Sequence, residues 1–95
     1  MNTSERIREI LEDENPEALL YDEMDDALIG VYRGDLARQD MREGSIAVYS
    51  YTKFLELYIK RDGMSEEEAI EFFDFNVAGG YIGKYQPIIV DDSGF

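Results

Sequence analysis

The stretch IAVYSYTKFLELYIKR, residues 46–61, decides the fold because its apolar spacing changes halfway along. In residues 46–51 apolar side chains alternate with a period of two, which predicts a strand. Residues 52–61 carry Phe54, Leu55, Tyr58 and Ile59 at helical spacing, and Gly63 stands where a helix would end. A strand followed at once by a helix fits a domain of the α+β class.

A second strand is predicted upstream, over residues 27–33, where Ala27, Ile29 and Val31 would share one face. We expect it to pair antiparallel with residues 46–51. The connection between them is too long for a tight hairpin and apolar enough to hold a helical turn. Before these strands, the pattern predicts a helix over residues 5–14, capped by Thr3 or Ser4, and a helical turn over residues 17–21 that follows a proline.

The C-terminal part begins with the clearest helix signal. Ser65 stands three residues before Glu68, the spacing of a capping box, and the acids at 66–68 favour the positive end of a helix over residues 66–78. Residues 87–90 predict a last strand, at the sheet edge or between the first two, and residues 91–95 a frayed tail. The predicted fold class is therefore α+β, in the order α-β-β-α-α-β, with a three-stranded, mostly antiparallel sheet packed by helices.

Length and composition limit what the chain can do. Its 95 residues supply one domain, residues 1–95, and 44% of them are hydrophobic, enough to build a core. The chain has no cysteine and no histidine, so it lacks the thiolate, the commonest metal ligand and the usual general base of enzymes. We therefore expect a non-enzymatic protein without a cofactor. The sequence has no signal-peptide pattern and no apolar run of membrane-spanning length, which favours a cytoplasmic location.

The charge of the chain points to a class of partner. Twenty-two acidic residues stand against nine basic ones, a formal net charge of −13. Such a surface repels nucleic acid and anionic lipid, and it attracts basic protein surfaces or cations. We therefore expect this chain to bind neither nucleic acid directly nor a membrane. Solubility alone would also explain the charge, because charge by itself identifies no partner.

The densest acidic segment, residues 12–26, contains no lysine or arginine, and its last part invites a calcium hypothesis. Asp22, Glu23, Asp25 and Asp26 supply the hard oxygens that calcium requires. The helix-loop-helix calcium template does not fit, however, because its closing glutamate position is occupied by Arg33. Because the segment is so acidic, a cation-binding module remains an alternative function.

The helix predicted over residues 66–78 carries one residue that breaks its pattern. A helical wheel places Glu67, Glu71 and Asp74 on an acidic side, opposite the apolar side that faces the core, and Phe75 falls among these acids. Two interpretations are open. Either the N-terminal helix or the tail covers Phe75, as is usual for an aromatic residue, or Phe75 is an anchor in an acidic rim that binds a basic protein or a second copy of the chain.

Three segments together resemble a known group of sequences: SEEEAIEFFDFNVAGGYIG at residues 65–83, DDALIG at 25–30 and IAVY at 46–49. They resemble short, uncharacterised acidic proteins of tailed bacteriophages and related environmental sequences, over roughly residues 17–90. The resemblance implies a small accessory viral protein made in the cytoplasm of a bacterial host, and it transfers no catalytic residues. Small acidic viral proteins sometimes imitate the charge of nucleic acid, so the resemblance suggests a basic host nucleic-acid-binding or defence protein as the partner.

The leading hypothesis is an acidic interaction protein that binds a basic protein surface. In it, the acids of residues 22–26 form one face with those of the helix over residues 66–78. A calcium-binding module is the second hypothesis, and a self-associating structural viral component, a homodimer through Phe75 and exposed tyrosines, is the third. The residues assigned to partner binding are Asp22, Glu23, Asp25, Asp26, Glu67, Glu71, Asp74 and Phe75.

Overall fold

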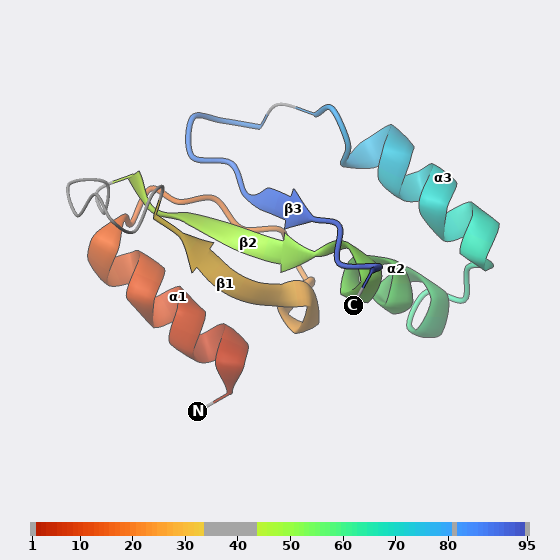
Figure 1. Ribbon diagram of the computed structural model, residues 1–95, viewed down its shortest axis with the longest axis horizontal. Coiled ribbons are helices and arrows are strands. Elements are labelled where there is room, and N and C mark those ends of the chain that lie inside the picture. Colours follow the sequence, from red (N-terminus) through yellow and green to blue (C-terminus); the bar gives the residue numbers. More distant parts are fainter. Residues whose placement is uncertain (1, 34–43, 81, 95) are drawn as a thin grey trace.

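The computed structural model describes residues 2–33, 44–80 and 82–94. Its elements follow the predicted order α-β-β-α-α-β, so the α+β fold class is confirmed (Figure 1). The helical turn expected between the first two strands falls almost wholly outside the described residues. The elements are α1 (Thr3–Glu14), the 3₁₀ turn η1 (Asp25–Ala27), β1 (Leu28–Tyr32), β2 (Ile46–Ser50), α2 (Tyr51–Lys60), α3 (Glu66–Asn76) and β3 (Ile88–Val90).

The sheet is mixed rather than mostly antiparallel, with the strand order β1-β2-β3. β1 and β2 pair antiparallel as expected, with a bulge between Leu28 and Gly30. β3 lies at the edge and runs parallel to β2, so it does not insert between the first two strands. The reason is the connection, because α2 and α3 form a long crossover, and a crossover of that length can return the chain in the same direction.

The N-terminal helix α1 begins earlier than the sequence predicted. Asn2, rather than Thr3 or Ser4, is its N-cap, and the Oδ1 atom of Asn2 accepts a hydrogen bond from the backbone N–H of Glu5 at 2.9 Å. Asparagine is among the best N-cap residues, because its short side chain satisfies a backbone N–H that the first helical turn leaves free. The cap prediction was therefore wrong by one to two positions.

The helical turn predicted over residues 17–21 does not form, because its backbone groups bind partners far along the chain. The N–H of Leu19 donates to the carbonyl of Tyr85 at 3.0 Å. The N–H of Tyr21 donates to the hydroxyl oxygen of Tyr49, also at 3.0 Å. These tertiary hydrogen bonds hold the segment as an extended strap in place of a helix.

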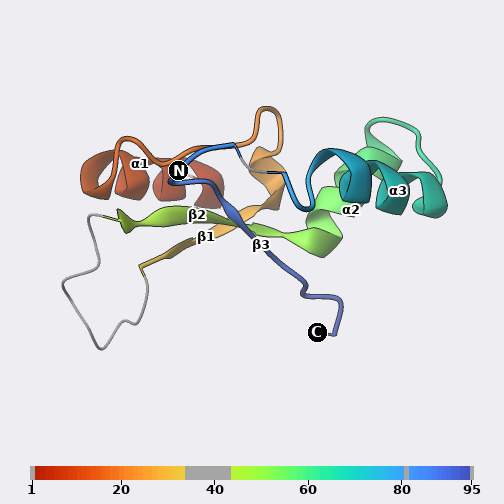
Figure 2. The same cartoon turned by 90° about the horizontal axis from the view of Figure 1, so that it is seen from above.

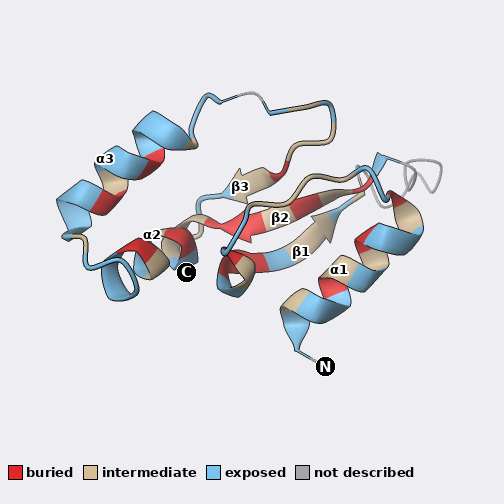
Figure 3. Ribbon diagram, turned by 180° about the vertical axis from the view of Figure 1, so that it is seen from behind, coloured by how far each residue is buried: buried red, intermediate tan, exposed pale blue. Residues whose placement is uncertain are grey.

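Aromatic rings form the centre of the core. Phe54 of α2 is 1% exposed, and its ring lies 5.5–5.8 Å from four other rings, each in an edge-to-face arrangement. Such contacts are the preferred geometry of aromatic pairs. The cluster joins the sheet to both C-terminal helices, and buried residues follow β2 and the inner sides of the helices (Figure 3). The four rings around Phe54 are those of Tyr21, Tyr49, Tyr58 and Phe73.

The two sides of the sheet differ. α1 and the chain that follows it lie on one side, while α2 and α3 continue from the end of β2 (Figure 2). Among the described residues, no helix lies on the other side (Figure 2). The core therefore lies on one side of the sheet, between the sheet and the layer formed by α1 and the chain that follows it.

Asp92 lies in the segment that the sequence predicted to be frayed, yet it is held by α2. Its carboxylate accepts hydrogen bonds from the hydroxyls of Ser50 and Thr52, at 2.5 and 2.9 Å, and from the backbone N–H of Thr52 at 3.0 Å. Ser50 is itself the N-cap of α2. The hydrogen bond from Ser50 is the main reason why the pKa of Asp92 falls to about 2. A carboxylate beside a helix N-terminus also interacts favourably with the helix dipole.

The change Asp92→Asn is expected to lower the free energy of unfolding by about 1–2 kcal/mol at neutral pH, because it removes charge-assisted hydrogen bonds. The pKa of Asp92 is lowered on folding, so its contribution is complete above the unfolded pKa near 3.8 and is lost as the pH falls towards about 2. Denaturant unfolding at several pH values measures this. The difference between wild type and variant should shrink between about pH 4 and pH 2, whereas a constant difference would contradict the assignment. Glu9→Gln, on the exposed side of α1, is the matched control.

Candidate functional site

Helix α3 carries the candidate site, and its start is fixed locally. The hydroxyl of Ser65 accepts a hydrogen bond from the N–H of Glu68 at 3.1 Å, and the Glu68 carboxylate accepts one from the N–H of Ser65 at 3.0 Å. This confirms the predicted capping box. The hydrogen bond from the Ser65 backbone lowers the pKa of Glu68, and the Glu68 carboxylate is thus bound to the N-cap of its own helix. Glu68 therefore orders the helix start beside the site.

The end of α3 comes earlier than predicted, at Asn76 rather than residue 78. The carbonyl of Phe73 accepts hydrogen bonds from both Val77 and Ala78, at 2.8 and 3.0 Å. Gly79 then takes a φ of 75°, a left-handed conformation that glycine adopts without strain and that ends many helices. This sharp exit leaves the last turn of α3 at the surface.

One side of α3 is an exposed aromatic surface. Ala69 and Phe73 face the core, but Phe72 is 42% exposed and Phe75 is 90% exposed. The interpretation that the N-terminal helix or the tail covers Phe75 is therefore wrong, and α1 lies at the other end of the molecule from α3 (Figure 1). Phe72 is held in place by an edge-to-face contact with Tyr58, with ring centroids 5.0 Å apart.

A shallow hollow of about 390 Å³ lies beside these two rings. We call its lining the α3 patch. Two glutamates line the hollow together with the rings, and none of the described lysines or arginines lines it. Apolar side chains inside a negatively charged border give the patch both contact area and charge. The α3 patch consists of Met64, Glu68, Glu71, Phe72, Phe75 and Asn76.

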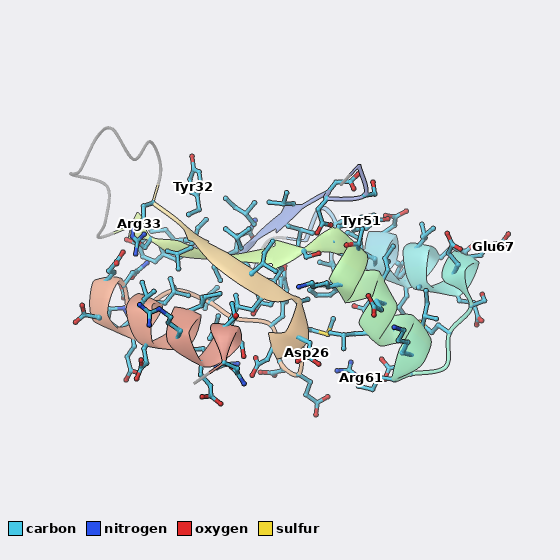
Figure 4. All side chains as sticks on the ribbon, turned by 60° about the horizontal axis from the view of Figure 1, so that its bottom comes forward. Asp26, Tyr32, Arg33, Tyr51, Arg61 and Glu67 are labelled. Carbon is cyan, nitrogen blue, oxygen red and sulfur yellow. The ribbon has the colours of Figure 1, made fainter. Side chains whose placement is uncertain are left out.

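The other acids of α3 point elsewhere. Glu67 is exposed near the start of the helix (Figure 4). Asp74 lines a cleft of about 550 Å³ between the end of α3, Tyr51 and the chain around β3, together with Asp91. Burial raises the pKa of Tyr51, and the negative charges of Asp74 and Asp91 raise it further. No lysine or arginine among the described residues lines this cleft, so its aromatic walls and two carboxylates are suited to a cationic side chain.

The acids of residues 22–26 do not form one face with α3. α2 contacts η1 and also contacts α3, so it lies between them. Figure 4 shows Asp26 and Glu67 on different parts of the molecule, with Arg61 close to Asp26. The hollow beside Asp26 is lined by Lys53, Glu56, Leu57 and Lys60 of α2 and by Arg61, the C-cap of α2. The expectation of a continuous acidic face is therefore wrong, because α2, with its two lysines and its basic C-cap Arg61, separates the two clusters.

Two residues of the 22–26 segment already have partners within the fold. Asp25 forms an ion pair with Arg8 of α1, and the carbonyl of Glu23 accepts a hydrogen bond from Arg61. Among the described residues, no group of three or more acids lies close enough together to hold a metal ion. The geometry thus gives the calcium hypothesis no support at this segment.

No protein-family model matches this chain, and comparisons with curated proteins and with solved structures gave no match either. The resemblance to short phage proteins therefore stays a prediction. Within the part of the chain that the structure describes, no helix is both long and apolar enough to cross a membrane.

Sequence reasoning found Phe75 but missed most of its surroundings. The wheel of α3 placed Phe75 among acids, which is a local property of the helix. Met64 precedes the helix and gave no signal of its own. The cleft beside Asp74 is built from segments far apart in the sequence, including Tyr21, Tyr51 and Asp91, so no local pattern could indicate it.

Proposed function

We propose that this chain is a non-enzymatic interaction protein that binds a basic segment of another protein through the α3 patch. One observation carries the proposal: Phe75 is 90% exposed beside Phe72, within a border of glutamates. Large aromatic residues dominate the binding energy of many interfaces, and an exposed apolar patch with a polar border is typical of a protein contact. The absence of cysteine and histidine from the chain favours binding over catalysis.

Charge selects the partner of the α3 patch. A second copy of this chain would bring Glu68 and Glu71 against the same residues of the first copy, with no basic residue of the patch to pair with them. Nucleic acid would be repelled by a chain of net charge −13. A basic protein segment meets both requirements, because its apolar side chains can cover Phe75 while its cations pair with the glutamates.

The cleft on the neighbouring side of α3 favours the same chemistry. Its aromatic walls come from Tyr51 and Phe73, and its two carboxylates come from Asp74 and Asp91. Aromatic rings attract ammonium and guanidinium groups, and carboxylates bind them through charge-assisted hydrogen bonds. A basic segment bound at the α3 patch could therefore place one lysine or arginine in the cleft.

Two synthetic peptides of equal positive charge test the proposal by calorimetric titration. One alternates lysine with leucine, and the other alternates lysine with serine. We expect the lysine–leucine peptide to bind more tightly to the wild-type chain. The change Phe75→Ala should weaken its binding by about tenfold or more, the usual effect of losing an aromatic anchor, and should leave the lysine–serine peptide unaffected.

Ile82→Ala is the matched control for Phe75→Ala. Ile82 is also an exposed apolar residue, at 52%, but it borders a different hollow near Leu19 and Tyr85. We expect the Ile82 variant to bind both peptides as the wild type does. Equal loss of binding in the two variants, or no loss in the Phe75 variant, would remove the α3 patch from the proposal.

The natural partner of the α3 patch can be proposed by its class. The resemblance to phage proteins suggests a basic nucleic-acid-binding or defence protein of a bacterial host. A nucleic-acid mimic would need acids spaced along one continuous face. Because α2 separates the acidic segments, we propose a local anchor on α3 in place of mimicry by the whole surface.

A further inference from the structure

The three strands carry apolar side chains on both faces of the sheet. Their sequences are LIGVY in β1, IAVYS in β2 and IIV in β3, with no charged residue in any of them. A sheet that packs on the core with one face and meets water with the other normally alternates apolar and polar residues. Strands that are apolar throughout are typical of sheets buried on both faces. Among the described residues, helices cover only one face of this sheet (Figure 2).

The strand register identifies the residues on the uncovered side, because paired residues of neighbouring strands point to the same face. Gly30, Val48 and Ile88 form a row across all three strands. Tyr32 pairs with Ile46 beside this row, and Val90 pairs with Ser50 on its other side. We call this surface the open face, and it consists of Gly30, Tyr32, Ile46, Val48, Ile88 and Val90.

Exposure agrees with this assignment. Tyr32 is 49% exposed and Val90 is 38% exposed, whereas Ala47 and Tyr49, which point to the other side of β2, are fully buried. Ile46, Val48 and Ile88 are partly exposed and are not among the residues that pack against the core. Figure 4 shows Tyr32 pointing away from α1. The uncovered side of the sheet is therefore apolar and accessible.

Gly30 shows that there is free space above the β1 end of the central row. A Cβ atom added at Gly30 would meet no atom within 4 Å, apart from those of its chain neighbours. The absence of a side chain in the central row lets a second layer approach the sheet closely. Packed sheets lie about 10 Å apart, a distance that the missing side chain at Gly30 makes easier to reach.

From this surface we infer that two copies of the chain pack together through their open faces, sheet against sheet. Charge argues for a second copy as the occupant. None of the six residues of the open face is ionised, although the chain has a net charge of −13. The carboxylate at its end, Asp92, already accepts hydrogen bonds from Ser50 and Thr52, so the face offers a basic partner little to pair with. Two copies that meet through their neutral faces keep their acidic helices apart, on the outer sides of the dimer.

The open face is small, and this sets the strength of the contact. Two strands of five residues and one of three, about 4.8 Å apart, cover a few hundred Å², less than the ~800 Å² that each partner buries in a standard interface. The dimer is therefore weak and forms at high protein concentration. Salt strengthens it, because screening reduces the repulsion between two acidic chains. Binding of a basic peptide to the α3 patch changes with salt in the opposite direction.

Sedimentation equilibrium of the full chain tests this inference, from about 10 µM to about 1 mM protein in about 50 and 500 mM NaCl. We expect the mean mass to rise with concentration from the monomer value of 11.0 kDa towards twice that value, and to rise further in the higher salt. A chain that stays monomeric at the highest concentration in both salts would overturn the inference.

The variant Gly30→Lys locates the contact. The position has room for a side chain and no left-handed backbone angle, so the variant should fold, and circular dichroism checks this. We expect it to be monomeric throughout, because it places a charge in the central row of the contact. Val90→Lys, at an exposed position of the same face, gives a second variant with the same expected result.

Phe75→Ala is the control, and it separates this inference from the proposed function. We expect the Phe75 variant to dimerise as the wild type does while it loses binding to the lysine–leucine peptide. The two lysine variants should bind that peptide normally. A dimer that survives both lysine variants but is lost in Phe75→Ala would overturn the inference and place self-association on α3.

Discussion

Replacement of Phe54 by alanine is expected to lower the free energy of unfolding by about 3–5 kcal/mol, the usual cost of removing a buried phenylalanine. The side chain is 1% exposed and contacts four aromatic rings, so its loss leaves a cavity between the sheet and both C-terminal helices. A domain of this size is stable by only about 5–15 kcal/mol. The variant should therefore be close to unfolding near physiological temperature.

Urea unfolding followed by circular dichroism measures this effect. Phe75→Ala is the control for the same substitution at a surface position, and we expect it to change the free energy of unfolding by no more than about 0.5 kcal/mol. A loss below about 1.5 kcal/mol in the Phe54 variant would mean that its surroundings collapse to fill the cavity, and it would contradict the central role given to the ring cluster.

Reversal of three acids on α3, as Glu67→Lys, Glu71→Lys and Asp74→Lys together, is expected to weaken binding of the lysine–leucine peptide about tenfold to hundredfold. Exposed charge pairs contribute about 0.2–1 kcal/mol each, and the reversal also replaces attraction by repulsion. The association rate should fall as well, because the acids of α3, with Glu71 in the patch and Asp74 in the neighbouring cleft, steer a basic peptide towards the helix. Stopped-flow fluorescence with a labelled peptide measures both quantities.

A second triple variant separates local charge from total charge. Reversal of Glu9, Glu12 and Asp13, all exposed on α1, changes the net charge from −13 to −7, as the α3 variant does, since each change adds two charges. We expect the α1 variant to weaken binding far less than the α3 variant. Equal losses would show that the peptide responds to the overall charge, and they would leave the acidic surface explained by solubility.

The features that the sequence predicted correctly depend on residues close together in the chain. The capping box of Ser65 and Glu68 needs only a spacing of three residues, and the exit at Gly79 needs only a residue that tolerates a left-handed backbone angle. The strand and helix of residues 46–61 followed from a change of period within one segment. These signals were enough for the order of elements and the fold class.

The features that the sequence analysis missed depend on tertiary contacts. The bulge between Leu28 and Gly30 breaks the alternation expected in β1, so Leu28 is buried while Ile29 is 38% exposed. The backbone of Tyr21 binds the hydroxyl of Tyr49, which no local propensity predicts. The direction of β3 depends on where two helices return the chain, and a period of two is the same in parallel and antiparallel strands.

The candidate site shows the same division. Helical periodicity alone placed Phe75 among acids, but its 90% exposure depends on which segments fail to reach it. The predicted acidic face failed because residues 22–26 and α3 are separated by α2, whose position cannot be read from its sequence. The apolar open face was visible in part, since IAVY and IIV lack the polar alternation of a one-sided sheet.

The most direct test of the central claim is an NMR titration of the labelled chain with the lysine–leucine peptide, in which amide shifts map the contact. We predict that the largest shifts fall on residues 64 and 66–76, that residues 22–26 and α1 shift little, and that Phe75→Ala removes the effect on α3. Shifts of similar size over all acidic segments, unchanged in the Phe75 variant, would contradict the claim, because they would show a diffuse attraction between charges and no site on α3.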